Sequence, residues 1–310
     1  MKHCLTLLIL ATAAAAGSTP RDDTTRPEVD LVVQELRTGI PHICRLEPGA
    51  REVHRIDLPP ADDRGAAAFG SGRPRWSPDG SKVAFELNGD EGAVDIAIVN
   101  ADGTGWRKIT EDGGSASPTW SPNGKQLAFT KGRTWQTAIY TVDLATNEMN
   151  MVADTAQTDR APEWSPDGSK IIFGSGLLAH RADEEDIYVV ERSSGNVRPL
   201  IEMKGRDAYP RYSPDGKHIA WTHTVGPKNE QIFICDATGM NPRQLTHTDR
   251  NWDAAWSPDG KWIYHTQYKS SRFAIARTNI ESGLTESVYQ AKSRVEAPDV
   301  RHAAANRSAP

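Results

Sequence analysis

The sequence contains very little cysteine. Only three cysteines, Cys4, Cys44 and Cys235, occur among the 310 residues. No C-x-x-C pair is present, so the short motifs that mark thiol redox centres and many zinc sites are excluded.

An excess of positive charge is also missing. The chain carries 36 Lys and Arg residues against 41 Asp and Glu residues, which gives a formal net charge of −5. A nucleic-acid-binding protein needs a basic patch or stripe, and none is visible, so this class is excluded. Three catalytic signatures are absent as well: the G-x-x-x-x-G-K-[ST] phosphate loop, the H-E-x-x-H helix and the G-x-S-x-G turn.

Long apolar runs are absent except at the N-terminus. Met1–His3 is a short basic start, and Leu5–Ala16 is an apolar run too short to span a bilayer. Ala14–Ala16 supplies the small residues that a signal peptidase needs. We therefore expect a signal peptide at residues 1–17, a disordered lead-in at 18–28, and a periplasmic or secreted protein. No transmembrane segment is expected after signal removal.

The sequence is rich in one five-residue repeat. W-S-P-D-G or a close variant occurs five times, and the motif serines lie 44 or 48 residues apart. That period is typical of one four-stranded blade of a β-propeller. The copies are Trp76–Gly80, Trp120–Gly124, Trp164–Gly168, Tyr212–Gly216 and Trp256–Gly260.

The motif indicates a tight turn between two strands. Pro78 presets the backbone angle of the second turn position, and the Asp79 side chain can accept hydrogen bonds from nearby backbone N–H groups. Gly80 can adopt the positive φ that such turns require. The aromatic residue before each serine is large and apolar, so we expect it to pack between neighbouring sheets.

The segments that flank the five copies indicate how the ring closes. Val29–Val33, His42–Arg45 and Val53–Asp57 match the second, third and fourth strands of a blade, whereas Glu296–Val300 resembles a first strand. We therefore predict an all-β fold, a six-bladed β-propeller at residues 29–301 with four-stranded antiparallel blades. The ring is closed by a blade shared between N- and C-terminal strands, which leaves no open sheet edge. A disordered tail is expected at 302–310.

This architecture makes a prediction for the two remaining cysteines. Cys44 and Cys235 fall in the third strands of two blades that are separated by another blade. A disulfide needs Cα atoms within about 7 Å of each other. We therefore predict two free, mostly buried thiols.

The repeat resembles a known family. The pattern P-x-W-S-P-D-G, an apolar strand and then D-I-Y-x-h resembles the PD40 or WD40-like repeats of the TolB propeller, on Pro162–Gly168, Ile171–Phe173 and Asp186–Val189. The resemblance implies a non-catalytic protein-binding or peptide-binding platform in the bacterial cell envelope. The TolB family binds the peptidoglycan-associated lipoprotein at the mouth of its propeller. Similar propellers occur in prolyl-oligopeptidase-like peptidases and, with a metal site, in oligogalacturonate lyases.

Charged residues gather where the propeller mouth is expected. The mouth is the face on which the fourth strand of one blade leads into the first strand of the next. We expect a monomer that binds an envelope protein or peptide there, without catalytic residues or a cofactor. The alternative is a solvated rim of weak ion pairs. The candidate binding residues are Arg73, Asp159, Arg160, Arg206, Asp207, Asp249, Arg250, Trp252, Arg294 and Glu296.

A second function, which depends on a bound metal, is the alternative. His180, His223, His247 and Gln267 fall in segments expected near the same face. Three imidazoles and an amide could hold a divalent metal, and the metal could polarise a sugar carboxylate for elimination. The protein would then be a metal-dependent polysaccharide (oligouronide) lyase or hydrolase. His265 stands where other repeats have Phe or Trp, so we expect it in the core.

Overall fold

A computed structural model describes residues 28–37, 40–56, 71–133, 136–176 and 184–302. The predicted signal peptide lies outside these ranges, as do most of the predicted lead-in and tail. His180 also lies outside them. No helix within the described ranges is long and apolar enough to cross a membrane.

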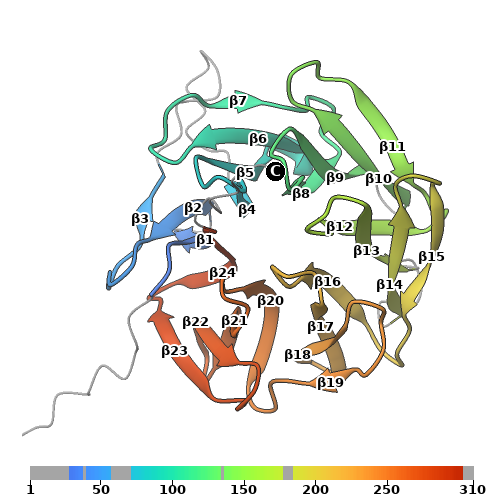
Figure 1. Cartoon of the computed structure of the whole chain (residues 1–310). Helices are drawn as coiled ribbons and strands as arrows, with labels where there is room; N and C mark the ends of the chain where they lie inside the picture. The colour runs from blue at the N-terminus through green and yellow to red at the C-terminus, as the bar shows by residue number, and fades with distance from the viewer. Residues whose placement is uncertain (1–27, 38–39, 57–70, 134–135, 177–183, 303–310) are drawn as a thin grey trace, which may run out of the picture.

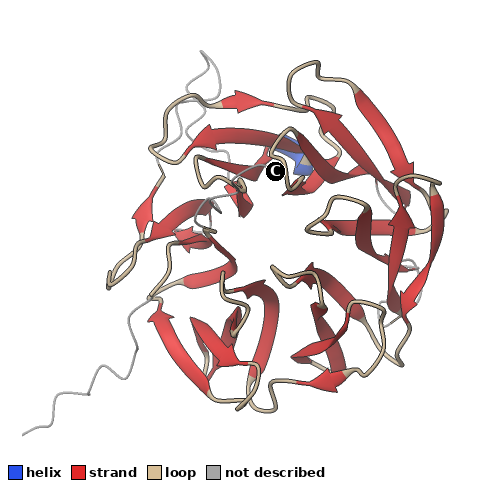
Figure 2. Cartoon of the chain, viewed as in Figure 1, coloured by secondary structure: helices blue, strands red, loops and turns tan. Residues whose placement is uncertain are grey.

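The described residues form strands that are joined by turns and loops. The one helical element among them is a single 3₁₀ turn, η1, at Asp90–Gly92 (Figure 2). Most strands are short and rich in β-branched and aromatic residues, as expected for half-buried sheets joined by tight turns. In chain order the strands are β1 Leu31–Arg37, β2 Ile40–Leu46, β3 His54–Arg55, β4 Ser71–Trp76, β5 Lys82–Asn88, β6 Val94–Asn100, β7 Arg107–Lys108, β8 Ser115–Trp120, β9 Gln126–Arg133, β10 Gln136–Asp143, β11 Met149–Ala153, β12 Thr158–Trp164, β13 Lys170–Gly176, β14 Glu185–Glu191, β15 Asn196–Ile201, β16 Asp207–Tyr212, β17 His218–Gly226, β18 Asn229–Asp236, β19 Arg243–Gln244, β20 Arg250–Trp256, β21 Trp262–Lys269, β22 Arg272–Asn279, β23 Thr285–Gln290 and β24 Arg294–Val300.

The strands are arranged as an all-β propeller. Antiparallel sheets stand in a ring around a common centre (Figure 1). Four sheets contain four strands each: β4–β7, β16–β19, β20–β23 and the set β24, β1, β2, β3. The fifth sheet contains eight strands, β8–β15, and a single parallel pair between Thr137 and Thr158 joins its two halves. The prediction of a propeller with antiparallel sheets is confirmed.

One sheet joins the two ends of the chain. β24 pairs antiparallel with β1, and β1 pairs with β2, so the innermost strand of this sheet comes from the C-terminal end. Leu31 lies opposite Val300, and Glu35 lies opposite Val295. The predicted shared sheet is therefore present.

The aromatic residue of each repeat packs against the preceding sheet. Trp76 shares a core cluster with Val32 and Ile43, and Trp256 shares one with Ala220 and Ile232. All five motif aromatics are less than a tenth exposed. Burying a large aromatic side chain is worth several kcal/mol, so these contacts stabilise the ring as a whole.

The S-P-D-G turn forms through its own side chains. The Ser77 hydroxyl donates to Asp79 at 2.6 Å, and the backbone N–H of Lys82 donates to the Ser77 hydroxyl at 2.9 Å. Gly80 has a φ of 67°. In the third copy, hydrogen bonds from Ser165 and Ser169 lower the pKa of Asp167 to about 2. Turn chemistry thus accounts for the repeated acidic residue.

The two thiols and His265 lie in the core. Cys44 and Cys235 are buried in different core clusters, and neither forms a disulfide. His265 is fully buried in β21, and its Nε2 lies 2.9 Å from the Thr278 hydroxyl. Burial lowers the pKa of His265 to about 4, although a hydrogen bond with the Thr266 carbonyl opposes the shift.

His265 should make the protein less stable in acid. The unfolded chain binds a proton at the ordinary pKa of about 6.5, whereas the folded chain binds it only near pH 4. Its contribution is therefore present above pH 6.5 and is lost as the pH falls towards 4. We expect His265→Phe, which restores the residue found in other repeats, to remove up to about 3 kcal/mol of this loss. Urea unfolding at pH 7.5 and pH 4.5 measures the effect. Identical pH dependence in both proteins would contradict it.

Candidate functional site

Each of the six inner strands is kinked at one residue. These strands are β4, β8, β12, β16, β20 and β24. At this residue the pairing register shifts, as between Ala208 and Arg211 of β16, and the backbone takes a positive φ of 45–58°. A positive φ is unusual for residues other than glycine, and together with the register shift it identifies a β-bulge. The residues are Arg73, Ser117, Ala161, Tyr209, Asp253 and Ala297, and they repeat every 44 or 48 residues.

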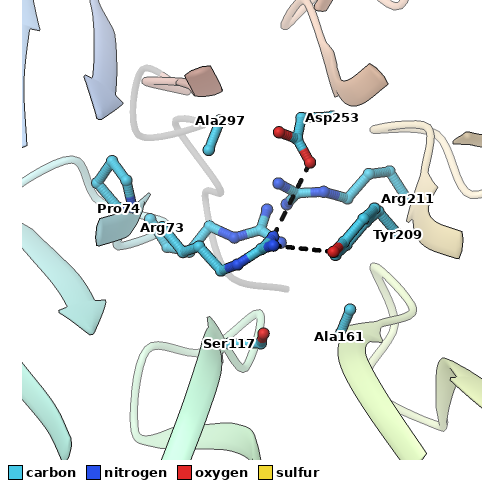
Figure 3. A pocket seen from close by; sticks show the side chains of 9 residues that line it. Arg73, Pro74, Ser117, Ala161, Tyr209, Arg211, Asp253 and Ala297 are labelled. Atoms are coloured by element: carbon cyan, nitrogen blue, oxygen red, sulfur yellow. Dashed lines mark hydrogen bonds and ion pairs between the residues drawn. The ribbon is translucent and has the colours of Figure 1, made fainter. Parts of the chain in front are cut away.

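The kinked residues surround the centre of the ring. All six line one cavity, together with Pro74, Arg75 and Arg211 (Figure 3). The cavity volume is about 20 Å³, which is room for about one water molecule. The centre is therefore filled by side chains.

Arg73 occupies the mouth side of this central cavity. Its guanidinium donates to the Tyr209 hydroxyl at 2.8 Å, and its central carbon lies 4.5 Å from the Tyr209 ring centroid (Figure 3). Glu86 and Asp253 lie farther away, with N···O distances of 3.6 and 3.9 Å. Burial alone would lower the pKa of Arg73, but these three partners outweigh burial and raise it. Arg73 is therefore a fixed positive charge at the mouth.

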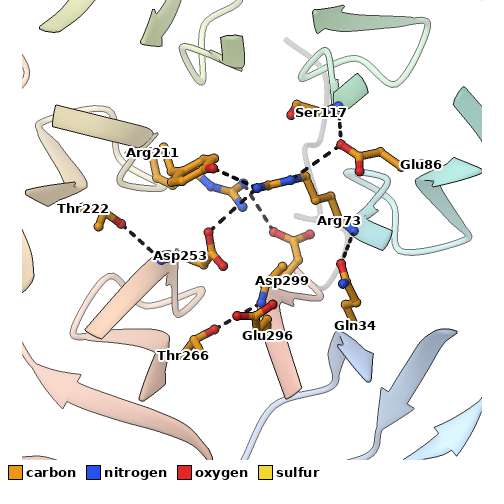
Figure 4. Close-up of polar contacts among 12 residues, drawn as sticks. Gln34, Arg73, Glu86, Ser117, Arg211, Thr222, Asp253, Thr266, Glu296 and Asp299 are labelled. Carbon is orange, nitrogen blue, oxygen red and sulfur yellow. Dashed lines mark hydrogen bonds and ion pairs between the residues drawn. The ribbon is translucent and has the colours of Figure 1, made fainter. Parts of the chain in front are cut away.

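A second layer of charge lies two residues further along the inner strands. Arg211 pairs with Glu163 at 3.3 Å and with Asp299 at 3.6 Å, and Arg75 reaches the same two carboxylates at 3.9 and 3.4 Å. Two positive and two negative side chains thus form a quartet that is neutral when both acids are ionised. The quartet lies at the centre of the ring beside the kinked residues, and Figure 4 shows Arg211 next to Asp299.

Each kink exposes a backbone N–H group, and a side chain of the preceding sheet usually caps it. Gln34 accepts from Arg73 N–H at 3.2 Å, and Glu86 accepts from Ser117 N–H at 2.8 Å (Figure 4). Three threonine hydroxyls accept the other bonds at 3.2 Å, namely Thr130 from Ala161, Thr222 from Asp253 and Thr266 from Ala297. These caps tie each inner strand to its neighbour.

One kink has no such cap. Gly174 occupies the capping position before Tyr209, and glycine has no side chain that could accept a hydrogen bond from the Tyr209 N–H. The Glu185 carboxylate fills the space instead, because a Cβ on Gly174 would lie 2.3 Å from its Oε1. Glu185 is 2% exposed and is held by Arg160 at 2.7 and 2.6 Å and by Arg206 at 2.7 Å. The sixfold pattern is therefore broken at Tyr209.

The predicted mouth residues all lie on or directly before the inner strands, but two of them are not available to a partner. Asp159 and Asp207 are fully buried. Asp159 accepts from the Thr155 N–H at 2.9 Å, and Asp207 accepts from the Trp221 indole at 2.7 Å. Both carboxylates are engaged in internal hydrogen bonds because the inner strands turn them towards the sheets.

The other predicted mouth residues form ion pairs. Arg160 and Arg206 share Glu185, as described above. The exposed Arg294 pairs with Glu296, which is also buried, at 2.8 Å, and Asp249 lies 3.6 Å from Lys269.

Two predicted mouth residues, Arg250 and Trp252, belong to a half-buried aromatic cluster on the sheet β20–β23. Glu230 holds Arg250 through two hydrogen bonds of 2.7 and 2.9 Å. The Arg250 guanidinium lies 5.4 Å from the Trp252 ring centroid. The Trp252 and Phe273 ring centroids are 6.1 Å apart, and Tyr268 lies 4.8 Å from Phe273. We call Arg250, Trp252, Tyr268 and Phe273 the aromatic cluster.

The structure does not bring the candidate metal ligands together. His223 is buried with its Nδ1 2.7 Å from Asp207, whereas His247 is exposed and Gln267 is buried in β21. No group of three or more His, Cys, Asp or Glu side chains that could hold a metal exists within the described part of the chain.

Several residues of the site were not predicted from the sequence. Tyr209, Glu185 and the four charges of the quartet were not singled out. An alignment of the repeats on their inner strands would have placed Arg75, Glu163, Arg211 and Asp299 at one equivalent position. The same alignment would have shown Gly174 where three repeats have threonine.

The quartet should make stability depend on pH. Burial raises the pKa of Glu163 to about 7, with Asp299 adding to the shift and Arg75 opposing it. The folded chain then keeps a proton that the unfolded chain releases at about 4.5, so stability falls as the pH rises from 4.5 to 7. Glu163→Gln should remove this fall, which is on the order of 1–3 kcal/mol. Urea unfolding across this pH range tests it, with the exposed Glu148→Gln as control; an unchanged slope in Glu163→Gln would refute it.

Comparisons with known proteins agree with this architecture. The sequence profile described as "TolB beta propeller domain" (PD40) matches residues 114–301. A comparison with curated proteins finds no significant match.

Among solved structures, TolB from Acinetobacter baumannii is similar with a TM-score of 0.74 and 20% identity over 87% of this chain and 66% of that one. A putative TolB from Agrobacterium tumefaciens has a TM-score of 0.64 and 19% identity over 85% and 89% of the two chains. An oligogalacturonate lyase from Vibrio parahaemolyticus has a TM-score of 0.56 and 16% identity over 86% and 75%. At these identities the likeness shows the fold alone, and the chain spans 66% of the length of the Acinetobacter protein. Since the family profile covers more than half of the sequence, the chain belongs to the PD40 family of TolB β-propeller domains.

Proposed function

We propose that this protein is an exported, non-catalytic propeller that binds a protein or peptide of the bacterial cell envelope at its mouth. The aromatic cluster is the observation that carries the proposal. Trp, Tyr and Arg are the residues that most often dominate binding energy at protein interfaces. Glu230 fixes Arg250 against Trp252 before any partner arrives, so little side-chain entropy is lost on binding.

The proposal includes a six-bladed ring at residues 29–301. The eight-stranded sheet then counts as two blades, β8–β11 and β12–β15. Six kinked inner strands support this count, because each blade contributes one residue of positive φ to the same cavity. A closed ring has no free sheet edge at which chains could aggregate. The signal peptide at 1–17, the lead-in at 18–28, the tail at 302–310 and the envelope location belong to the same proposal.

The metal-dependent lyase is the less supported alternative. Its chemistry needs several ligands around one metal ion, and the described members of His180, His223, His247 and Gln267 do not form such a set. His223 already uses its Nδ1 with Asp207. We therefore derive no reaction step through a metal, and we keep the lyase as an outcome of the experiment below.

Substitutions on the two faces of the ring test the proposed function. Trp252→Ala removes a member of the aromatic cluster, whereas Leu284→Ala removes a side chain that is 55% exposed in the β22–β23 turn on the opposite face. Envelope proteins captured by the wild type would be identified, purified and titrated against both variants. We expect at least tenfold weaker binding by Trp252→Ala, as for other interface anchors, and unchanged binding by Leu284→Ala.

Two results would contradict the proposed function. Equal affinity of both variants for every captured protein would place the binding surface elsewhere. Metal-dependent release of unsaturated products from oligogalacturonate by the wild-type protein would establish the lyase instead.

A further inference from the structure

We propose that the centre of the mouth is a carboxylate-binding site that receives an acidic group of the partner. Arg73 and Arg206 form the site, and the Tyr209 side chain occupies the place that the carboxylate would take. The inference rests on the proposed function and names the chemistry of the group that enters the channel. The carboxylate could be the C-terminus of a peptide or an Asp or Glu side chain.

Two guanidinium groups converge on one neutral side chain at this site. Arg73 donates to the Tyr209 hydroxyl at 2.8 Å, and the Arg206 guanidinium lies 5.6 Å from the Tyr209 ring centroid and interacts with the same hydroxyl. A guanidinium binds a carboxylate in a charge-assisted bond that is about twice as strong as a bond to a neutral acceptor. The phenol oxygen is thus a weak acceptor at a point where an anionic oxygen would bind better.

Arg73 has spare capacity to bind a carboxylate. A guanidinium carries five N–H donors, and the hydroxyl of Tyr209 is the acceptor that the Arg73 side chain reaches within hydrogen-bonding distance among the described residues. Glu86 and Asp253 lie 3.6 and 3.9 Å away, and Glu86 already accepts from the Ser117 N–H. The side chain of Arg73 is 33% exposed, so an incoming group can reach it.

Arg206 belongs to a group with more positive than negative side chains. Arg160 and Arg206 share the single carboxylate of Glu185. Arg206 lies beside Tyr209, whereas Glu86 and Asp253 are neighbours of Arg73. An incoming carboxylate would therefore complete the pairing of Arg206.

The break in the sixfold pattern allows the site to open. The cavity of about 20 Å³ is too small for a carboxylate, so the Tyr209 ring must move aside when the ligand enters. β16 is the inner strand whose kinked residue lacks a cap, because Gly174 has no side chain. Tyr209 is therefore less restrained by the neighbouring sheet than the equivalent residues that are capped.

Small carboxylates test the inference without knowledge of the partner. The probes are N-acetyl-diglycine, its C-terminal amide, and N-acetyl-aspartate amide, titrated calorimetrically at constant ionic strength. We expect both carboxylates to bind and the diglycine amide to bind at least tenfold more weakly. The tighter of the two carboxylates assigns the source as a chain terminus or a side chain.

Four variants separate the site from general effects of charge. Arg73→Gln and Arg206→Gln should each weaken carboxylate binding at least tenfold. Tyr209→Ala should bind as tightly as the wild type or more tightly, and it should fold, because Ala161 and Ala297 adopt the same positive φ at equivalent positions. Arg243→Gln is the matched control, since this exposed arginine on β19 contacts the Ile280 carbonyl away from the mouth.

Equal binding of the acid and the amide would overturn the inference, as would equal loss in Arg73→Gln and Arg243→Gln. Circular dichroism of each variant would confirm that it is folded. Failure of the two proposals can be told apart. If carboxylates do not bind while Trp252→Ala still weakens partner binding, the carboxylate site is wrong and the proposed function stands.

Discussion

The structure depends on one backbone feature, the residue of positive φ in each inner strand. A regular inner strand would point its side chains alternately to the two faces of its sheet, towards the neighbouring sheets, and would leave the centre of the ring unfilled. The kink turns one backbone N–H towards the preceding sheet and places its residue at the central cavity. Because a side chain of the preceding sheet caps most of these groups, the feature that shapes the channel also joins the sheets.

The channel is built in two layers with different roles. The lower layer consists of Arg75, Glu163, Arg211 and Asp299, which pair with one another in a mostly buried position. Buried ion pairs contribute little net stability but are costly to disrupt, so this layer is expected to stay fixed. The upper layer combines Arg73 and Tyr209 with the Arg160–Glu185–Arg206 group, in which two arginines share one carboxylate. This upper layer is the one to which we assign recognition in the proposal above.

The fold could be predicted from the sequence because each repeat contains the residues that determine its own local structure. The S-P-D-G turn, the aromatic residue before it and the period of 44 or 48 residues each depend on local chemistry. The sheet shared between the chain ends followed from the first strand that was missing at the N-terminus. The pattern predicts six blades, whereas the structure has four four-stranded sheets and one eight-stranded sheet, because one parallel pair joins β8–β15.

The site could be predicted only in part. The sequence placed the charged residues in the loops at the mouth, whereas all of them except Arg206 and Asp249 lie on the inner strands. Asp159 and Asp207 are buried, while Arg73 and Arg250 are half-buried, and no local pattern distinguishes the two cases. The quartet joins residues as distant as Arg75 and Asp299, which are 224 positions apart, and no local pattern reports such a pairing.

Hydrogen exchange of the six kinked residues tests the central claim most directly. The claim is that the ring of caps is open at Tyr209 and closed at the equivalent positions. Nuclear magnetic resonance would follow the amides of Arg73, Ser117, Ala161, Tyr209, Asp253 and Ala297, corrected for their intrinsic rates. The account predicts that the Tyr209 amide exchanges at least tenfold faster than the other five. Equal protection of all six amides would contradict it and would show that the Gly174 position does not loosen the ring.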